Sequence, residues 1–168
     1  VLEDAFEHGR RHGERRGAQH AGPVRRHGDG GNAGRRSVEP SAEQRARLAA
    51  AYPGVRLLAA ADGTLASAGI VVWAVKPQSF AAAAAPCAAH VGGALQLSVM
   101  AGLRSEAIAQ ATGSPRVVRA MPNTPALIGR GIAGLFARPA VTADERRTIE
   151  QVLEPTGQLL WLEREADL

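Results

Sequence analysis

Three short segments carry the residue types best suited to binding a ligand. They are Ala74-Val75-Lys76-Pro77, Met100-Ala101-Gly102 and Met121-Pro122-Asn123-Thr124-Pro125. Small residues let backbone amides and carbonyls approach a flat ring or a ribose closely, and a lysine offers a positive charge to a phosphate or a ribose. Together these segments favour a nucleotide site.

The last segment is a rigid loop. Pro122 and Pro125 have fixed φ angles and donate no backbone hydrogen bond, so they end the preceding strand and hold Asn123 and Thr124 in one presentation. A turn that serves only as a connection remains an alternative interpretation.

Apolar runs before the three segments predict strands at 70–75, 94–99 and 116–119. Between them lie predicted helices at 78–90, split or kinked by Pro86, and at 105–111. This βαβαβ alternation is typical of a parallel sheet, in which strand carboxyl ends meet at one edge and ligands bind there. We therefore expect the three segments to line one edge of an α/β sheet.

The remaining periodicities extend the same fold. Capping boxes at Ser41 and Thr142 predict helices over 45–52 and 145–153. Further strands are expected at 55–59, 131–137 and 158–162.

Composition supports one α/β domain over 37–168, because 45% of the 168 residues are hydrophobic but only 4% are aromatic. No apolar run of about 18 residues occurs, which argues against a membrane span. Cys87 is the only cysteine, so no internal disulfide can form. A cytoplasmic location is expected.

Residues 1–36 differ from the rest of the chain. They contain eight arginines, eight glycines, four histidines and five acids, and only four large apolar residues. We expect a basic segment that is disordered or translated out of frame, although a nucleic-acid-binding arm is an alternative. The interspersed acids and the lack of interleaved aromatics make nucleic acid an unlikely partner. A partial glycine fingerprint at 28–33 is rejected because no hydrophobic strand precedes it.

Several catalytic motifs are absent from the sequence: a phosphate-binding P-loop, His-Glu-x-x-His, paired cysteines and Gly-x-Ser-x-Gly. No catalytic residue and no metal site is predicted.

Residues 37–168 resemble the N-terminal, cofactor-binding domain of pyrroline-5-carboxylate reductase. The resemblance rests on segments in the family's order: 74–78, 100–102, 118–125, Gly131 and 157–161. It implies a Rossmann-like, mostly parallel sheet with flanking helices. It also implies binding of NADPH or NADH, and hydride transfer to the C=N carbon of 1-pyrroline-5-carboxylate, which gives proline.

The resemblance assigns roles to individual residues. Ala74, Val75, Lys76 and Pro77 would line the cofactor, with Ala101 and Gly102 beside its nicotinamide end. Asn123 would lie near the reacting ring, in a substrate-side loop that includes Pro122 and Thr124. Arg119 is expected to brace that loop. Glu39 would favour NADH, whereas Ser37 and Arg36 could accommodate a 2′-phosphate, so the choice of cofactor stays open.

Compared with the family, the sequence is expected to be incomplete at both ends. It supplies no first strand with a glycine-rich phosphate turn, and it lacks the helical domain through which the family forms homo-oligomers. We therefore expect a fragment that binds the dinucleotide weakly and has no turnover by itself. Another Rossmann-type reductase, acting on a hydroxy acid or a prephenate-like substrate, and a non-enzymatic binding protein are the alternatives.

Overall fold

The computed structural model describes residues 34–168; the predictions for residues 1–33 lie outside this range. The first described unit is a small parallel sheet of β1 (Arg36–Val38) and β2 (Arg56–Leu58), joined by helix α2 (Ala42–Ala51). Strand β1 thus begins at the last residue of the predicted N-terminal segment.

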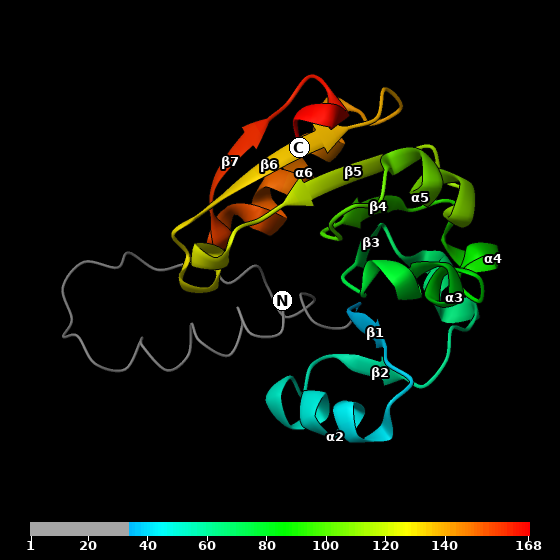
Figure 1. The fold of residues 1–168 in the computed structure, drawn as a ribbon. Coiled ribbons are helices and arrows are strands. Elements are labelled where there is room, and N and C mark those ends of the chain that lie inside the picture. Colours follow the sequence, from blue (N-terminus) through cyan, green and yellow to red (C-terminus); the bar gives the residue numbers. More distant parts are fainter. Residues whose placement is uncertain (1–33) are drawn as a thin grey trace, which may run out of the picture.

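The second sheet has five strands in the order β3-β4-β5-β6-β7 (Figure 1). Their bounds are Ile70–Trp73, Leu95–Ser98, Val117–Met121, Gly131–Ala137 and Gly157–Trp161. Strands β3, β4 and β5 are mutually parallel, β6 is antiparallel to β5, and β7 is parallel to β6. The sheet is therefore mostly parallel.

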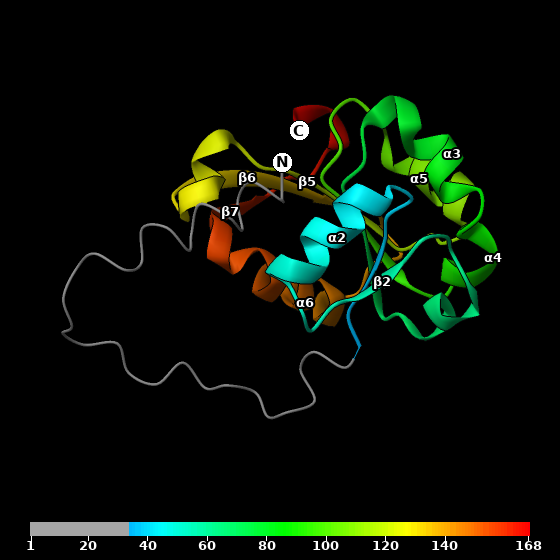
Figure 2. The ribbon, with the colours of Figure 1, turned by 90° about the horizontal axis from the view of Figure 1, so that it is seen from below.

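Helices cover both faces of this sheet (Figure 2). Helices α3 (Phe80–Ala84), α4 (Ala88–Val91) and α5 (Ser105–Thr112) contribute Phe80, Ala84, Val91 and Ile108 to one core cluster, which also contains Trp73 and Val117. Helix α6 (Ala143–Leu153) contributes Ile149 and Leu153 to the second cluster, with residues of β4, β5 and β6. The sheet that carries the candidate site is thus packed between two layers of helices.

Short 3-10 helices occupy several connections. They are η1 (Gly63–Ser67), η2 (Pro77–Ser79), η3 (Thr124–Ile128), η4 (Glu154–Thr156) and η5 (Glu165–Asp167). The predicted rigid loop after β5 thus contains one such turn.

The Thr142 capping box is confirmed, whereas Ser41 is an N-cap without the reciprocal bond, because its amide donates to the carboxylate of Glu39 and not to the side chain of Gln44. The Ser41 hydroxyl accepts a hydrogen bond from Gln44 N (3.3 Å), and Thr142 and Glu145 form a reciprocal capping box. The alanine-rich stretch is split as expected, since α3 ends at Ala84 and α4 begins at Ala88, on either side of Pro86. Strand β3 is shorter than predicted: it ends at Trp73, which leaves Ala74 and Val75 in the following loop.

This arrangement of a mostly parallel sheet between helices is Rossmann-like, as expected. Within the described residues the two sheets remain separate.

Candidate functional site

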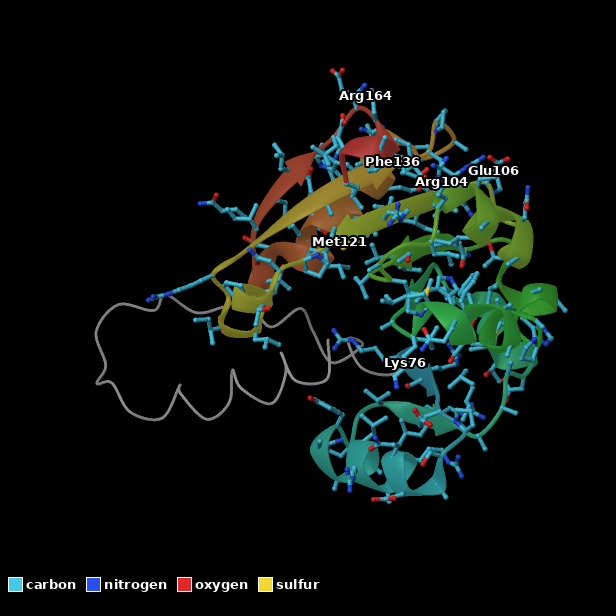
Figure 3. All side chains as sticks on the ribbon, viewed as in Figure 1. Lys76, Arg104, Glu106, Met121, Phe136 and Arg164 are labelled. Atoms are coloured by element: carbon cyan, nitrogen blue, oxygen red, sulfur yellow. The ribbon has the colours of Figure 1, made fainter. Side chains whose placement is uncertain are left out.

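The three segments lie at the same edge of the five-stranded sheet. Because β3, β4 and β5 are parallel and in register, with Trp73, Ser98 and Arg119 side by side, their carboxyl ends point the same way. Figure 3 labels Lys76 and Met121, which mark the first and the third of these strand ends. The topology therefore brings together residues that are about 50 positions apart in the sequence.

The segment after β3 is exposed throughout, from Ala74 to Pro77. Helix η2 begins at Pro77, and the amide of Ser79 donates to the carbonyl of Lys76 (2.8 Å). This hydrogen-bonded turn fixes the backbone at Lys76. Its side chain has no ion pair among the described residues, so its charge is available to a ligand.

The segment after β4 begins with the buried Met100 and is exposed to solvent after that residue. Met100 is buried, and its amide donates to the Ser98 hydroxyl (3.2 Å). Ala101 and Gly102 are exposed. Gly102 has φ +74°, a conformation that favours glycine, and no atom of the chain lies within 4 Å of the position of a Cβ there. A flat group could thus approach this backbone closely.

The segment after β5 is attached to the first residues of β6. Pro122 is half-buried, whereas Asn123 and Thr124 are exposed. The side-chain oxygen of Asn123 accepts a hydrogen bond from the amide of Ile132, at the start of β6 (3.0 Å). Asn123 therefore ties the loop to the sheet with its carbonyl oxygen, and its amide nitrogen remains to donate to a ligand.

Two glycines make room for this loop. A Cβ on Gly131 would lie 2.8 Å from Ala126 of η3, and Gly131 is the register partner of Gly157. Gly157 has φ +126°, and a Cβ there would lie 2.2 Å from the Gly131 carbonyl oxygen. Close packing of η3 on the start of β6 and β7 requires both residues to lack a side chain.

Arg119 lies on β5, two residues before Met121, and is buried. Its side chain is 7% exposed and forms an ion pair with Glu165 (3.0 Å). Glu165 also accepts hydrogen bonds from the amide (2.5 Å) and the hydroxyl (2.8 Å) of Ser105, the first residue of α5. The ion pair of Arg119 thus joins the C-terminal segment to β5 and α5, whereas its expected bracing of the 121–125 loop stays a prediction.

Partial burial by itself raises the pKa of Glu165. The hydrogen bonds from Ser105 and the charge of Arg119 outweigh this effect and hold the pKa below its usual value. Glu165 is therefore a carboxylate at neutral pH. The sequence reasoning missed this residue, because nothing local links positions 46 residues apart.

Glu39 lies just after β1, where a ribose would be bound. Its carboxylate accepts a hydrogen bond from the amide of Ser41 (2.8 Å), and the nearby Arg45 donates to the carbonyls of Glu39 (2.7 Å) and Pro40 (2.6 Å). Both the acid and the neighbouring base are thus engaged with backbone.

Comparison with known proteins finds similar reductases. No protein-family model matches the chain. Over 135 residues it is 37% identical to the pyrroline-5-carboxylate reductase of Pseudomonas aeruginosa, covering 79% of this chain and 49% of that protein. The chain is a relative of pyrroline-5-carboxylate reductase. It spans about half the length of this curated relative.

Solved reductase structures have the same fold. The pyrroline-5-carboxylate reductase of Coxiella burnetii superimposes with a TM-score of 0.68 at 25% identity, over 81% of this chain and 52% of that one. The Plasmodium falciparum pyrroline carboxylate reductase, solved with NADP bound, gives a TM-score of 0.58 at 21% identity, over 66% of this chain and 42% of that one.

The strand ends carry residue types suited to binding a dinucleotide. Exposed small residues and the open space over Gly102 suit a flat ring, and Lys76 offers one positive charge. Within residues 34–168 no glycine-rich turn between a strand and a helix is present to cradle a pyrophosphate. None of the helices in this range is long and apolar enough to cross a membrane.

Proposed function

We propose that residues 37–168 form the cofactor-binding domain of a pyrroline-5-carboxylate reductase. In this reaction NADPH or NADH reduces 1-pyrroline-5-carboxylate to proline. The observation that carries the proposal is the meeting of the Lys76, Gly102 and Asn123 segments at one sheet edge, in a chain 37% identical to such a reductase.

The chain's own residues would bind and orient the cofactor. Ala74, Val75, Lys76 and Pro77 would line the cofactor, with the charge of Lys76 offered to a ribose or a phosphate. Ala101 and Gly102 would contact the nicotinamide end through backbone that no side chain covers.

The loop after β5 would face the substrate. Asn123 would present its amide nitrogen to the reacting rings while its oxygen remains on Ile132, and Pro122 and Thr124 would form the adjoining substrate-side wall. The cofactor supplies the hydride, so the domain has to contribute positioning and electrostatics.

We also propose a cellular location, an assembly state and a class of partner. We expect a cytoplasmic enzyme of a family that forms homo-oligomers, with a small-molecule substrate and no nucleic-acid partner. Because residues 34–168 contain no glycine-rich turn that would cradle the pyrophosphate, we expect them to bind NADPH or NADH weakly.

Another reductase of the same fold is the second candidate. The sequence of the loop at 121–125 disfavours it, because this Met-Pro-Asn-Thr-Pro segment is part of the resemblance to pyrroline-5-carboxylate reductase.

An NMR titration of the full chain with NADPH and with NADH tests the proposed site. Amide shifts are expected at Lys76, Ala101, Gly102 and Asn123, with Glu106 as an exposed control outside the three segments. Shifts confined to other parts of the sheet would contradict the site. Oxidation of NADPH that depends on 1-pyrroline-5-carboxylate would contradict the expected lack of turnover and support the proposed reaction.

A further inference from the structure

The carboxylate of Glu39 is held in a defined place at the carboxyl end of β1. Its backbone continues the pairing with β2, because its amide donates to the Leu58 carbonyl (2.9 Å). One carboxylate oxygen, Oε1, accepts a hydrogen bond from the amide of Ser41 (2.8 Å). The second oxygen, Oε2, accepts no hydrogen bond from residues 34–168, and the side chain is only half-buried. Glu39 therefore offers one fixed acceptor to a ligand.

The two arginines of helix α2 are engaged elsewhere. Arg45 donates through Nη1 to the carbonyls of Glu39 (2.7 Å) and Pro40 (2.6 Å), so a phosphate would have to compete with both for its guanidinium. Arg47 forms an ion pair with Glu43 (2.7 Å), a second acid in the first turn of the helix. Neither arginine therefore has a free charge to set against that of Glu39.

Arg36 and Ser37 lie earlier on β1 than Glu39. Arg36 is three residues before Glu39, which places its Cα about 10 Å from that of Glu39, toward the amino end of the strand. Its Nη1 donates to the carbonyl of Gly34 (3.3 Å), so the guanidinium is directed away from the carboxyl end. Ser37 is nearer but carries no charge. The carboxyl end of β1 therefore presents an acid without a free arginine.

We propose that Glu39 makes this domain select NADH over NADPH, an inference that rests on the proposed function. In dinucleotide-binding folds an acid after a strand of the first βαβ unit binds the ribose 2′-hydroxyl of NAD, whereas a nearby arginine accommodates the 2′-phosphate of NADP. Glu39 follows β1 and precedes α2, and its Oε2 accepts the hydrogen bond of that hydroxyl.

NADPH meets a different environment at the same position. Its 2′-phosphate carries a charge of about −1.5 to −2 and has no proton to spare for an acceptor. It would lie against a carboxylate that Ser41 holds in place, and like charges brought together in this way oppose binding. The hydroxyl of NADH gains a bond where the phosphate of NADPH is repelled.

Titration of the full chain with NADH and with NADPH measures the preference. We expect NADH to bind at least about tenfold more tightly. Glu39→Gln keeps a side-chain oxygen for the Ser41 amide and removes the charge, so the ratio of the two dissociation constants should fall about tenfold. Glu43→Gln is the matched control, because it makes the same charge change at an exposed position in the first turn of α2 and should leave the ratio unchanged. An equal change in both variants would overturn the assignment to Glu39.

Lys76 provides a second control, because it has no ion pair among the described residues. If its charge acts on the phosphates that both cofactors share, Lys76→Ala should weaken NADH and NADPH binding by the same factor. A loss confined to NADPH would show that Lys76 binds the 2′-phosphate, and would overturn the proposal.

An analogue of NADH with 2′-deoxyadenosine tests the contact without any variant. It should bind the unmodified chain about tenfold more weakly than NADH, because the carboxylate loses its donor. Equal binding of the analogue, or NADPH binding as tight as that of NADH, would overturn the selectivity and leave the proposed function standing. If neither NADH nor NADPH binds at millimolar concentration, the proposed function and this inference both fail.

Discussion

The guanidinium of Arg119 and the carboxylate of Glu165 form an ion pair 3.0 Å long at the centre of the sheet, although they lie 46 residues apart in sequence. The same carboxylate receives both the amide and the hydroxyl of Ser105. The end of the described chain is thus fastened to the strand that leads into the Asn123 loop and to the start of α5.

We expect Glu165→Gln to lower the free energy of unfolding by about 2 kcal/mol, because Arg119 would lose its charged partner while buried. Urea denaturation measures the change. Glu163→Gln is the matched control, since Glu163 is exposed, lies two residues away and should have little effect. Equal stability of the two variants would show that the ion pair contributes nothing net.

Stability should also fall in acid through Glu165. Its pKa is lower in the folded chain than in the unfolded chain, so its contribution is complete above the ordinary glutamate value of about 4.3 and is lost as the pH falls through the folded value. Denaturation curves between neutral pH and acid should therefore be less pH-dependent in Glu165→Gln. Part of the dependence should remain, since the pKa values of Glu145 and Asp62 are lowered as well.

Because Gly131 and Gly157 are in close contact, we expect a methyl group added at Gly157 to destabilise the fold strongly. Gly157→Ala forces a side chain onto the Gly131 backbone at a positive φ, and should destabilise the fold by about 3 kcal/mol. Thermal unfolding measures this change. Gly63→Ala is the control, because no atom lies within 4 Å of a Cβ there. A stable Gly157→Ala chain with an unchanged loop would refute the close approach.

The two ends of the Asn123 amide can be tested separately. Asn123→Ala removes the acceptor for the Ile132 amide, so hydrogen exchange at Ile132 should accelerate with the loss of about 1 kcal/mol. Asn123→Asp keeps an acceptor and should retain slow exchange at Ile132. If the amide nitrogen contacts the ligand as proposed, both variants should weaken NADH and NADPH binding, which titration measures.

Much of the fold was predictable from local patterns. The capping residues Ser41 and Thr142 marked two helices correctly, and the apolar runs located β3, β4 and β5 to within a few residues. Strand ends were less certain. Trp73 ends β3 because the chain then turns into η2, a tertiary outcome that the apolar run through Val75 conceals.

The site was predictable only in part. The sequence grouped Lys76, Gly102 and Asn123 through the expected parallel order, and the observed pairing brings their strand ends to one edge. Their contacts with a cofactor stay a prediction. The bond from Ile132 to Asn123 and the role of Glu165 were missed, because no pattern in the sequence relates such distant positions.

By itself, the sequence determined the alternation of strands and helices, the caps and the rigid loop between Pro122 and Pro125, since these depend on neighbouring residues and on fixed backbone angles. Only the tertiary structure decided that β6 runs antiparallel to β5 and that Glu165 neutralises buried Arg119. These features depend on pairing between distant segments, which is set by packing of the whole chain.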